Sequence, residues 1–198
     1  RYAHRFRHTH DAILVGVNTV IHDNPSLTVR LFQGKQPLRI VIDPHGRIPK
    51  TATLLTDEHP TLLVTYVPED ALRAALMLAD NKRIFYIPPE EKRAIWPALL
   101  KELAKQSITS LFIEGGGTTL GYALRARCIQ EIVLVLGPKV FGGKANASPF
   151  SIPVAESVCQ AITIEPRRWK RIHNDIVVMG TVLYDEHSTK SQGHDPKE

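Results

Sequence analysis

Three consecutive glycines at positions 115–117 restrict the fold of this chain more than any other feature. They follow a short, bounded apolar run at 111–113, which predicts a buried strand, and Glu114 stands at the carboxyl end of that run. The segment 118–127 is helix-like, and its first threonines can cap a helix. A strand, a glycine loop and a helix N-terminus together favour an anion site, because backbone N–H groups point outward there. The next apolar run, 132–136, completes a predicted βαβ crossover.

Three other kinds of turn compete with an anion-binding glycine loop. It is not a Walker loop, because no Gly-Lys-Ser/Thr follows. It is not the dinucleotide fingerprint G-x-G-x-x-G either, because the glycines fall at 115, 117 and 121. A tight turn that needs positive φ and binds nothing stays open. A carboxylate directly before three glycines favours a ligand.

Length and composition predict an ordinary globular protein of one domain, 1–185, followed by a disordered polar tail, 186–198. The chain has 198 residues, 43% hydrophobic and 23% charged. No apolar run approaches the roughly 18 residues of a membrane span, and no signal peptide is visible. Cys128 and Cys159 lack metal-type spacing and any disulfide framework, which indicates a reducing, cytoplasmic compartment.

The charge balance says little about partners. A formal charge of +5 is explained by small anionic ligands as well as by nucleic acid. Aromatic residues make up 7% of the chain and are not interleaved with basic ones as in a stacking surface. We therefore expect a small-molecule ligand, with neither nucleic acid nor a membrane as partner.

The first ten residues are basic and helix-like, and no strand precedes them. Because the chain begins with Arg1 and not with methionine, we expect that something upstream was removed or not seen. His4 and His8 lie one helical turn apart, which could suggest a metal pair. No carboxylate or cysteine completes that set, so a solvated basic face is preferred and no metal site is predicted.

Buried strands alternate with helices along the rest of the chain. Strands are predicted at 11–17, 38–44, 61–66 and 83–87, with helices at 71–79 and around Leu99, Leu100 and Leu103. Residues 172–184 pair two extended runs as an antiparallel hairpin. These elements predict an α/β fold with a mostly parallel central sheet, flanked by helices, and an antiparallel edge formed by the hairpin.

Polar residues collect where the predicted strands end. The set comprises Thr19, Asp23, Asp43 and Glu114. For Asp23 a capped turn that bonds its own backbone is an equal alternative. A second glycine-rich loop, 137–144, offers Lys139 or Lys144 to a phosphate, although solvated loop lysines explain it as well. A crevice lined by such residues suits a phosphorylated ligand or a dinucleotide.

Several stretches in one order resemble the pyrimidine reductases of riboflavin biosynthesis, either as the C-terminal reductase domain of the bifunctional deaminase/reductase or in its stand-alone form. They are Arg5-Phe6-Arg7, 11–16, Thr19-Val20, 23–30, 40–43, 113–118 and 138–143. The resemblance implies a dihydrofolate-reductase-like fold, NADPH as cofactor and a homodimer. It also implies hydride transfer to the ribose C1′ of 5-amino-6-(5-phosphoribosylamino)uracil, with the ring opened as an imine, which converts ribosyl to ribityl.

The family pattern carries over to particular positions of this chain. Matching substrate contacts are Arg7, Leu27, Arg30 and Glu114. Matching cofactor contacts are Thr19, Asp23, Pro44, Gly115, Gly116, Gly117, Thr118, Thr119, Leu120 and Gly121. Arg7 and Arg30 can clamp a phosphate, and the catalytic carboxylates Asp23 and Glu114 can orient polar groups or stabilise an iminium-like carbon.

The chain departs from the family pattern in several places. An opening strand with a Ser-Leu-Asp-Gly type motif is absent before Arg1, Asn24 stands where aspartate is common, and Pro44 replaces a frequent serine. No zinc-deaminase signature occurs. Open alternatives are the 2,5-diamino pyrimidinone as substrate, and a module that binds NADPH or another anionic ligand without turnover.

Overall fold

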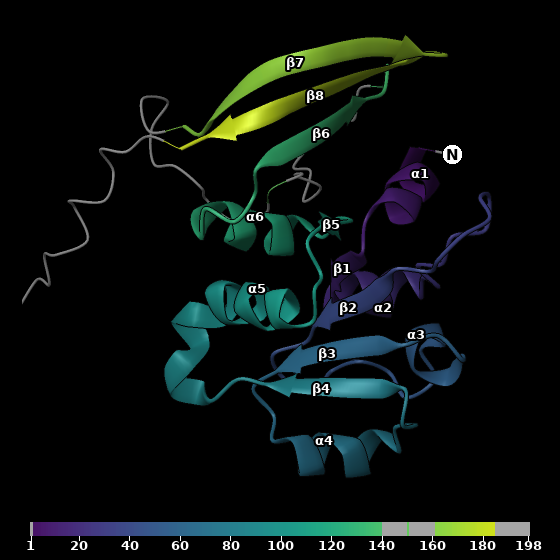
Figure 1. Ribbon diagram of the computed structural model, residues 1–198, viewed down its shortest axis with the longest axis vertical. Helices are drawn as coiled ribbons and strands as arrows, with labels where there is room; N and C mark the ends of the chain where they lie inside the picture. Colours follow the sequence, from purple (N-terminus) through teal and green to yellow (C-terminus); the bar gives the residue numbers. More distant parts are fainter. Residues whose placement is uncertain (1, 140–149, 151–160, 185–198) are drawn as a thin grey trace, which may run out of the picture. The chain divides into compact units, whose positions relative to one another are not determined.

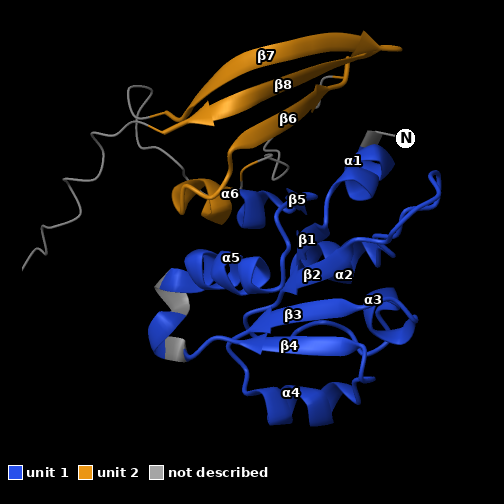
Figure 2. Ribbon diagram, in the orientation of Figure 1, with its two compact units in different colours: residues 1–120 blue, residues 121–198 orange. Residues whose placement is uncertain are grey.

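The computed structural model describes residues 2–139, 150 and 161–184, and the side chains of residues 2, 89, 92 and 93 lie outside that description. Its described elements appear in Figure 1 in this order: α1 (Tyr2–Thr9), β1 (Ala12–Gly16), α2 (Val17–Asp23), β2 (Leu38–Ile42), α3 (Thr53–Thr56), β3 (Thr61–Thr65), α4 (Glu69–Leu76), β4 (Lys82–Tyr86), η1 (Pro89–Ala94), α5 (Ile95–Lys105), β5 (Leu111–Ile113), α6 (Gly117–Arg125), β6 (Glu131–Leu136), β7 (Thr163–Ile172) and β8 (Asp175–Leu183). The chain divides into two compact units, 1–120 and 121–198 (Figure 2).

The first unit is built on a parallel sheet of five strands in the order β4-β3-β2-β1-β5. Strands β1, β2 and β3 are largely buried on both faces, as is usual for parallel sheets, and are apolar except at Arg39, Thr61 and Thr65. On one face Ile13, Val41 and Leu63 join side chains of α2, α3 and α4 in a common core. Successive strand residues point to opposite faces, and the crossover from β4 to β5 places α5, with buried Trp96 and Leu99, on the other face.

The predicted parallel strands are confirmed, with small shifts at their ends. The helix predicted at 71–79 begins earlier and ends at Leu76, because Met77 adopts a left-handed backbone conformation. The strand at 111–113 is confirmed as well, but its three residues are half-buried, because β5 is an edge strand of this sheet and pairs with β1 alone in it.

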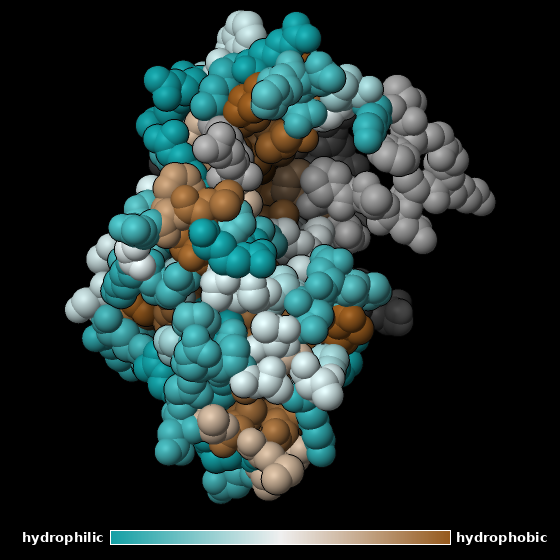
Figure 3. All heavy atoms as spheres, turned by 90° about the vertical axis from the view of Figure 1, so that its right-hand side faces the viewer, coloured by the Kyte–Doolittle hydropathy of each residue, from teal (hydrophilic) through white to brown (hydrophobic). Residues whose placement is uncertain are grey.

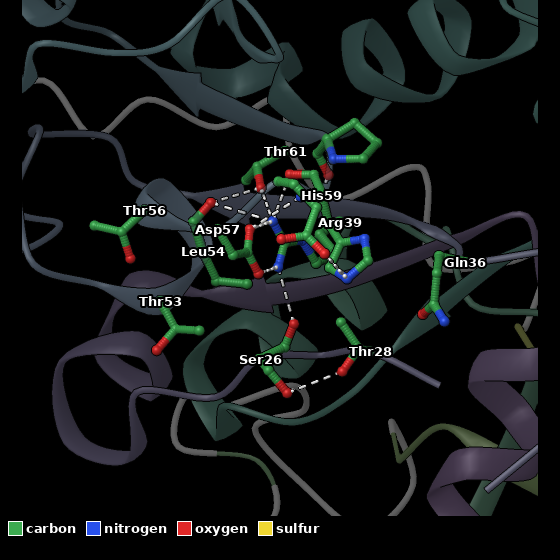
Figure 4. Close-up of polar contacts among 12 residues, drawn as sticks. Ser26, Thr28, Gln36, Arg39, Thr53, Leu54, Thr56, Asp57, His59 and Thr61 are labelled. Carbon is green, nitrogen blue, oxygen red and sulfur yellow. Dashed lines mark hydrogen bonds and ion pairs between the residues drawn. The ribbon is translucent and has the colours of Figure 1, made fainter. Parts of the chain in front are cut away.

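A buried charged cluster joins the amino-terminal ends of β2, β3 and β4. Arg39 donates to both carboxylate oxygens of Asp57 and, at 2.8 Å, to Thr61 Oγ1 (Figure 4). Lys82 Nζ lies 3.2 Å from Asp57 Oδ1 and donates to the carbonyl of His59 at 2.6 Å. Since Arg39 also donates to the carbonyl of Ser26 at 3.0 Å, the cluster anchors the segment after α2 to the sheet.

Asp11, just before β1, accepts hydrogen bonds from the residues that precede β5. Its Oδ2 accepts hydrogen bonds from the amide and hydroxyl of Thr109 and of Ser110, all at 2.9–3.1 Å. The backbone hydrogen bond from Thr109, followed by those from Ser110, lowers the pKa of Asp11 to about 2. The carboxylate therefore contributes stability above its unfolded pKa of about 3.9, and that contribution is lost as the pH falls towards 2.

Asp11→Asn is expected to lower the urea concentration at the midpoint of unfolding at pH 7. In this variant the midpoint should also decrease less between about pH 4 and pH 2 than it does in the parent. The amide of asparagine can accept fewer of these hydrogen bonds, and it does not titrate. Asp80→Asn, at an exposed carboxylate, is the matched control and should leave the pH profile unchanged. An Asp11→Asn profile that falls as steeply as the parent's would contradict this role.

The second unit contains an antiparallel sheet in the order β6-β8-β7, and it corrects one prediction. The hairpin of β7 and β8 is confirmed, with His173 and Asn174 at the turn. The predicted βαβ crossover is wrong, because β6 pairs with β8 in antiparallel register and not with the parallel sheet. The hairpin likewise pairs with β6 in its own sheet, so it is not an edge of the parallel sheet.

Gly180 on β8 lies opposite an irregularity in β7 between Pro166 and Arg168. A Cβ at this position would come within 2.6 Å of Ile164 Cγ2 and 2.7 Å of the carbonyl oxygen of Glu165. Gly180→Ala is therefore expected to lower the free energy of unfolding by about 2 kcal/mol, as overpacking does. Thermal unfolding should show this, while Gly137→Ala, where a Cβ would lie 3.5 Å from Asp175 Oδ1, should show little. Equal effects of the two substitutions would contradict the steric explanation.

Two predictions fall outside the described residues. The glycine-rich loop 137–144 is described only as far as Lys139, and the polar tail 186–198 is not described at all. None of the helices in the described residues has the length and apolar character that a membrane crossing requires.

Candidate active site

The glycine loop connects β5 to α6 at the carboxyl end of the parallel sheet. Gly115 and Gly116 have φ values of 82° and 81°, a left-handed conformation that favours glycine. The amide of Glu114 is bonded to Leu14 of β1 at 2.9 Å, so the loop leaves the sheet directly after that residue. A Cβ on Gly115 would meet nothing within 4 Å, and the loop is therefore open on that side.

The backbone amides of residues 115–119 have no hydrogen-bond partner among the described residues. In the described part of the chain, no hydrogen bond runs from any of these amides to another group. Helix α6 begins at Gly117, so its first amides have no partner inside the helix. Residues 115–117 are half-buried, Thr118 is exposed and Thr119 is buried. This turn is thus neither sealed under side chains nor satisfied internally, and it can receive an anion.

Two threonines line the junction between the glycine loop and the end of β1. A Cβ on Gly116 would lie 3.3 Å from Thr19 Oγ1 and 3.4 Å from Thr119 Oγ1. A Cβ on Gly16 would clash with Thr119 Oγ1, so a side chain there would force Thr119 to move. Helix α6 begins at Gly117, one residue earlier than expected, and Thr118 lies inside its first turn and not at the cap.

Arg7 and Glu114, both predicted substrate contacts, meet in the structure across 107 positions of sequence. Arg7 Nη2 and Nε donate to the two carboxylate oxygens of Glu114 at 2.6 and 2.7 Å. Arg7 Nη1 also donates to the carbonyl of Thr28 at 3.3 Å. Only 11% of the Arg7 side chain and 26% of the Glu114 side chain are exposed, so the pair is largely desolvated. Arg7 therefore holds Glu114 and is not a free phosphate clamp.

Arg30 lies exposed beside α1. Its amide donates to His4 Nδ1 at 3.4 Å. Burial, and then the positive charges of Arg7 and Arg30, lower the pKa of His4, so both guanidinium groups lie near this imidazole. In the described residues no carboxylate pairs with Arg30. His4 was predicted to belong to a solvated basic face, although the three-residue spacing of His4 and Arg7 places them on one side of a helix.

The other predicted site residues are more scattered. Leu27 as a whole residue is 2% exposed, with φ 53°, and its side chain packs in the core. Asp23 is exposed at the end of α2, one turn beyond Thr19, and it makes no hydrogen bond or ion pair with another described residue. The carbonyl of Pro44, just after β2, accepts from the amide of Tyr66 at 3.1 Å. Leu120 donates its amide to Gly116, and Gly121 follows within α6.

A group of metal ligands or a separate cavity would offer an alternative site. In the described residues no group of three or more histidine, cysteine or carboxylate side chains could hold a metal ion. A cavity of about 350 Å³ lies at the opposite, amino-terminal edge of the sheet, where its lining includes Leu38, Pro60 and Ile108. None of the predicted site residues lines it.

Comparison with known proteins shows where the chain belongs. The model of the RibD C-terminal domain family matches residues 1–178. The chain is a member of this family. It is 36% identical over 151 residues to the riboflavin biosynthesis protein RibD of Bacillus amyloliquefaciens, covering 75% of this chain and 40% of the relative. It is 30% identical over 185 residues to the 2,5-diamino-6-ribosylamino-4(3H)-pyrimidinone 5′-phosphate reductase of Methanothermobacter thermautotrophicus, covering 92% and 84%.

Solved structures of RibD proteins share the fold. The chain superposes on Acinetobacter baumannii RibD with a TM-score of 0.76 at 24% identity, covering 92% of this chain and 49% of the other. Rib7, the riboflavin biosynthesis reductase of Saccharomyces cerevisiae, gives a TM-score of 0.70 at 22% identity, covering 92% and 80%. The chain spans about half the length, 40–48%, of the first RibD relatives it matches.

Proposed function

We propose that this RibD-type chain is an NADPH-dependent reductase of riboflavin biosynthesis, which reduces the ribosyl group of 5-amino-6-(5-phosphoribosylamino)uracil to ribityl. The observation that carries the proposal is the set of unconsumed amides at 115–119 on an open glycine turn. Backbone N–H groups at a helix start are suited to a dinucleotide diphosphate. Relatives named as pyrimidinone phosphate reductases support the reaction class.

The residues at the carboxyl end of the sheet fit a dinucleotide. A ligand can approach Gly115 closely, because a Cβ there would meet open space. In this proposal the loop 115–121 binds the diphosphate, while Thr19, Asp23 and Pro44 contact the rest of the cofactor. Bound there, NADPH supplies the hydride.

The ion pair of Glu114 with Arg7 gives the chain a carboxylate that is fixed in place. With 26% of its side chain exposed, Glu114 can still face a substrate while both oxygens are held by Arg7. A fixed negative charge stabilises positive charge that develops on a reacting carbon, and it needs no reorganisation to do so. We assign this electrostatic and positioning role to Glu114, and Asp23 remains a second candidate at the end of α2.

The substrate phosphate is assigned chiefly to Arg30. Arg30 is exposed and lies beside His4 and Arg7, so an anion there would meet two guanidinium groups. Arg7 adds charge but is held by Glu114, and Leu27 is buried in the core.

The direct test follows NADPH absorbance with the purified chain and either the deaminated pyrimidine substrate or its 2,5-diamino form. We expect oxidation with the deaminated substrate, and the diamino form tests the reaction named for the archaeal relatives. Calorimetry measures NADPH binding in parallel. If NADPH binds and neither substrate is reduced at saturation, the chain is a binding module and the proposed reaction falls.

Arg30→Ala is expected to weaken substrate binding by roughly 10- to 100-fold, because it removes charge-assisted hydrogen bonds to a phosphate. The affinity for NADPH should change less than about threefold, since the Arg30 site lies beside α1 and not at the glycine loop. Isothermal titration with each ligand separates the two effects. Arg83→Ala, at an exposed arginine that donates to Gln106, is the control. Equal losses for substrate and cofactor would contradict the assignment.

We also propose a cytoplasmic homodimer as the working form. In the second unit, the antiparallel sheet exposes the apolar residues Leu136, Trp169 and Ile176 at 44–72% on one face, and it exposes Val135 and Leu183 on the other. Figure 3 shows hydrophobic surface, in brown, gathered in patches on the face it draws. Exposed apolar patches of this kind mark association surfaces, and closed twofold pairs are the commonest outcome. Sedimentation equilibrium should give twice the chain mass, whereas a monomer at high concentration would contradict a dimer.

A further inference from the structure

The residue before Arg30 is held by a side chain that the functions assigned so far do not use. Gln36 bonds both backbone groups of Val29: its Oε1 accepts from the Val29 amide at 2.7 Å, and its Nε2 donates to the Val29 carbonyl at 3.0 Å. Gln36 is half-buried and Val29 is 5% exposed, so both bonds are partly shielded from water. One side-chain amide thus makes the pair of hydrogen bonds that an opposite residue makes in an antiparallel ladder.

The peptide unit between Val29 and Arg30 is fixed from both of its edges. Its carbonyl oxygen accepts from Gln36, and its N–H donates to His4 Nδ1 at 3.4 Å. Because a peptide unit is planar, bonds on opposite edges set the orientation of the plane and the direction in which the chain enters Arg30 Cα. The exposed side chain of Arg30 therefore leaves the backbone from a fixed point.

His4 accepts the Arg30 amide only while its Nδ1 carries no proton. Burial, and then the positive charges of Arg7 and Arg30, lower the pKa of His4, which keeps the imidazole neutral at pH 7. The remaining ring proton is then on Nε2. The backbone of Arg30 is thus anchored on α1 as well as at Gln36.

The same segment is connected to the carboxylate of the proposed site. Arg7, which holds Glu114 through two bonds, also donates to the carbonyl of Thr28 at 3.3 Å. The spacing between the backbone at 28–30 and the carboxylate is therefore set before a ligand binds. A substrate with its phosphate at Arg30 and its reacting carbon near Glu114 needs this spacing, because small displacements of reacting atoms reduce the rate sharply.

We infer, on the basis of the proposed function, that Gln36 is the positioning residue of the substrate-phosphate site, because it holds the backbone from which Arg30 reaches the phosphate. Residues 31–35, which follow Arg30, are all exposed, so no buried side chain among them holds this part of the loop. An arginine loses rotamer freedom when it binds an anion, and a backbone that is already ordered adds no further loss.

Calorimetry with the deaminated pyrimidine substrate, without NADPH so that no turnover occurs, compares the parent with Gln36→Ala, Arg30→Ala and the double variant. Gln36→Ala is expected to raise the Kd for the substrate by roughly 5- to 10-fold, because it removes both bonds to Val29. Since Gln36 acts through Arg30, the double variant should bind within about twofold of Arg30→Ala. Gln33→Ala, at an exposed glutamine of the same loop, is the matched control and should bind as the parent does.

Two further measurements separate positioning from a loss of folded structure. Gln36→Glu keeps the size of the side chain but replaces the donor that faces the Val29 carbonyl by an acceptor. It should therefore weaken substrate binding at least as much as Gln36→Ala. The Kd for NADPH should stay within about twofold in every variant, because the amides at 115–119 are unchanged.

The outcomes separate the inference from the function on which it rests. An unchanged substrate Kd in Gln36→Ala, effects of Gln36→Ala and Arg30→Ala that multiply in the double variant, or equal losses of substrate and NADPH would each overturn the positioning role alone. If Arg30→Ala binds the substrate as the parent does, or the parent binds none, the proposed phosphate site falls and the inference falls with it.

Discussion

Asp57→Asn is expected to lower the free energy of unfolding by about 3–5 kcal/mol, a large share of the total stability of a domain. The side chains of Arg39 and Lys82 are 1% and 0% exposed, and Asp57 is their shared counter-ion. Removing one partner of a buried ion pair leaves uncompensated charge, which costs more than the pair itself contributes. Asparagine keeps the shape of Asp57 and removes its charge, so the electrostatic effect is isolated.

The same cluster predicts a dependence on acid. Burial alone would raise the pKa of Asp57, but hydrogen bonds and charges from Arg39 and Lys82 outweigh it, and the pKa is lowered. Its contribution is therefore present above the unfolded pKa of about 3.9 and is lost as the pH falls through the folded pKa. Urea unfolding followed by circular dichroism measures both effects. Asp80→Asn serves as the exposed control, and a change at Asp57 below about 1 kcal/mol would contradict the cluster's role.

Glu114→Gln is expected to lower kcat/KM for the pyrimidine substrate by at least about 100-fold, the scale observed when a preorganised electrostatic group is removed. Glutamine fills the same space but cannot stabilise positive charge at the reacting carbon. It also leaves Arg7, 11% exposed, without its carboxylate. The affinity for NADPH should change by less than about threefold, because the amides at 115–119 are unchanged.

Two controls separate catalysis from folding in this experiment. Glu69→Gln removes an exposed carboxylate from an ion pair with Arg73 on α4 and should leave kcat/KM unchanged. Thermal unfolding of Glu114→Gln is measured as well, and both proteins are assayed at a temperature where the variant is fully folded, because leaving Arg7 without its carboxylate lowers stability. An active Glu114→Gln variant with kcat/KM within about threefold of the parent would remove Glu114 from the mechanism.

The sequence predicted the parallel sheet well for a physical reason. Strands β1, β2 and β3 are buried on both faces, so each reads as a short apolar run that no amphipathic helix would produce. The hairpin was predictable because its extended runs are separated by only two turn residues, His173 and Asn174. The glycine loop was predictable because glycine tolerates the positive φ found at Gly115 and Gly116.

Other features depend on contacts between distant residues, and no local pattern reports them. The run at β6 is as apolar as that of a parallel strand, so only the pairing with β8 reveals its sheet. Lys82 and Arg39 look like solvated charges in sequence, yet both are buried because Asp57 from another segment pairs with them. Arg7 was predicted to clamp a phosphate, and its partner Glu114 lies 107 positions away.

One titration tests most directly whether a dinucleotide diphosphate binds to the amides of the glycine loop. Amide signals of residues 115–119, assigned in a ¹⁵N-correlation spectrum, are followed as NADPH is added. The structure predicts that these amides, which have no hydrogen-bond partner in the described residues, shift downfield together as the site fills. NADPH binding, measured by calorimetry, with these five signals unmoved would contradict the account.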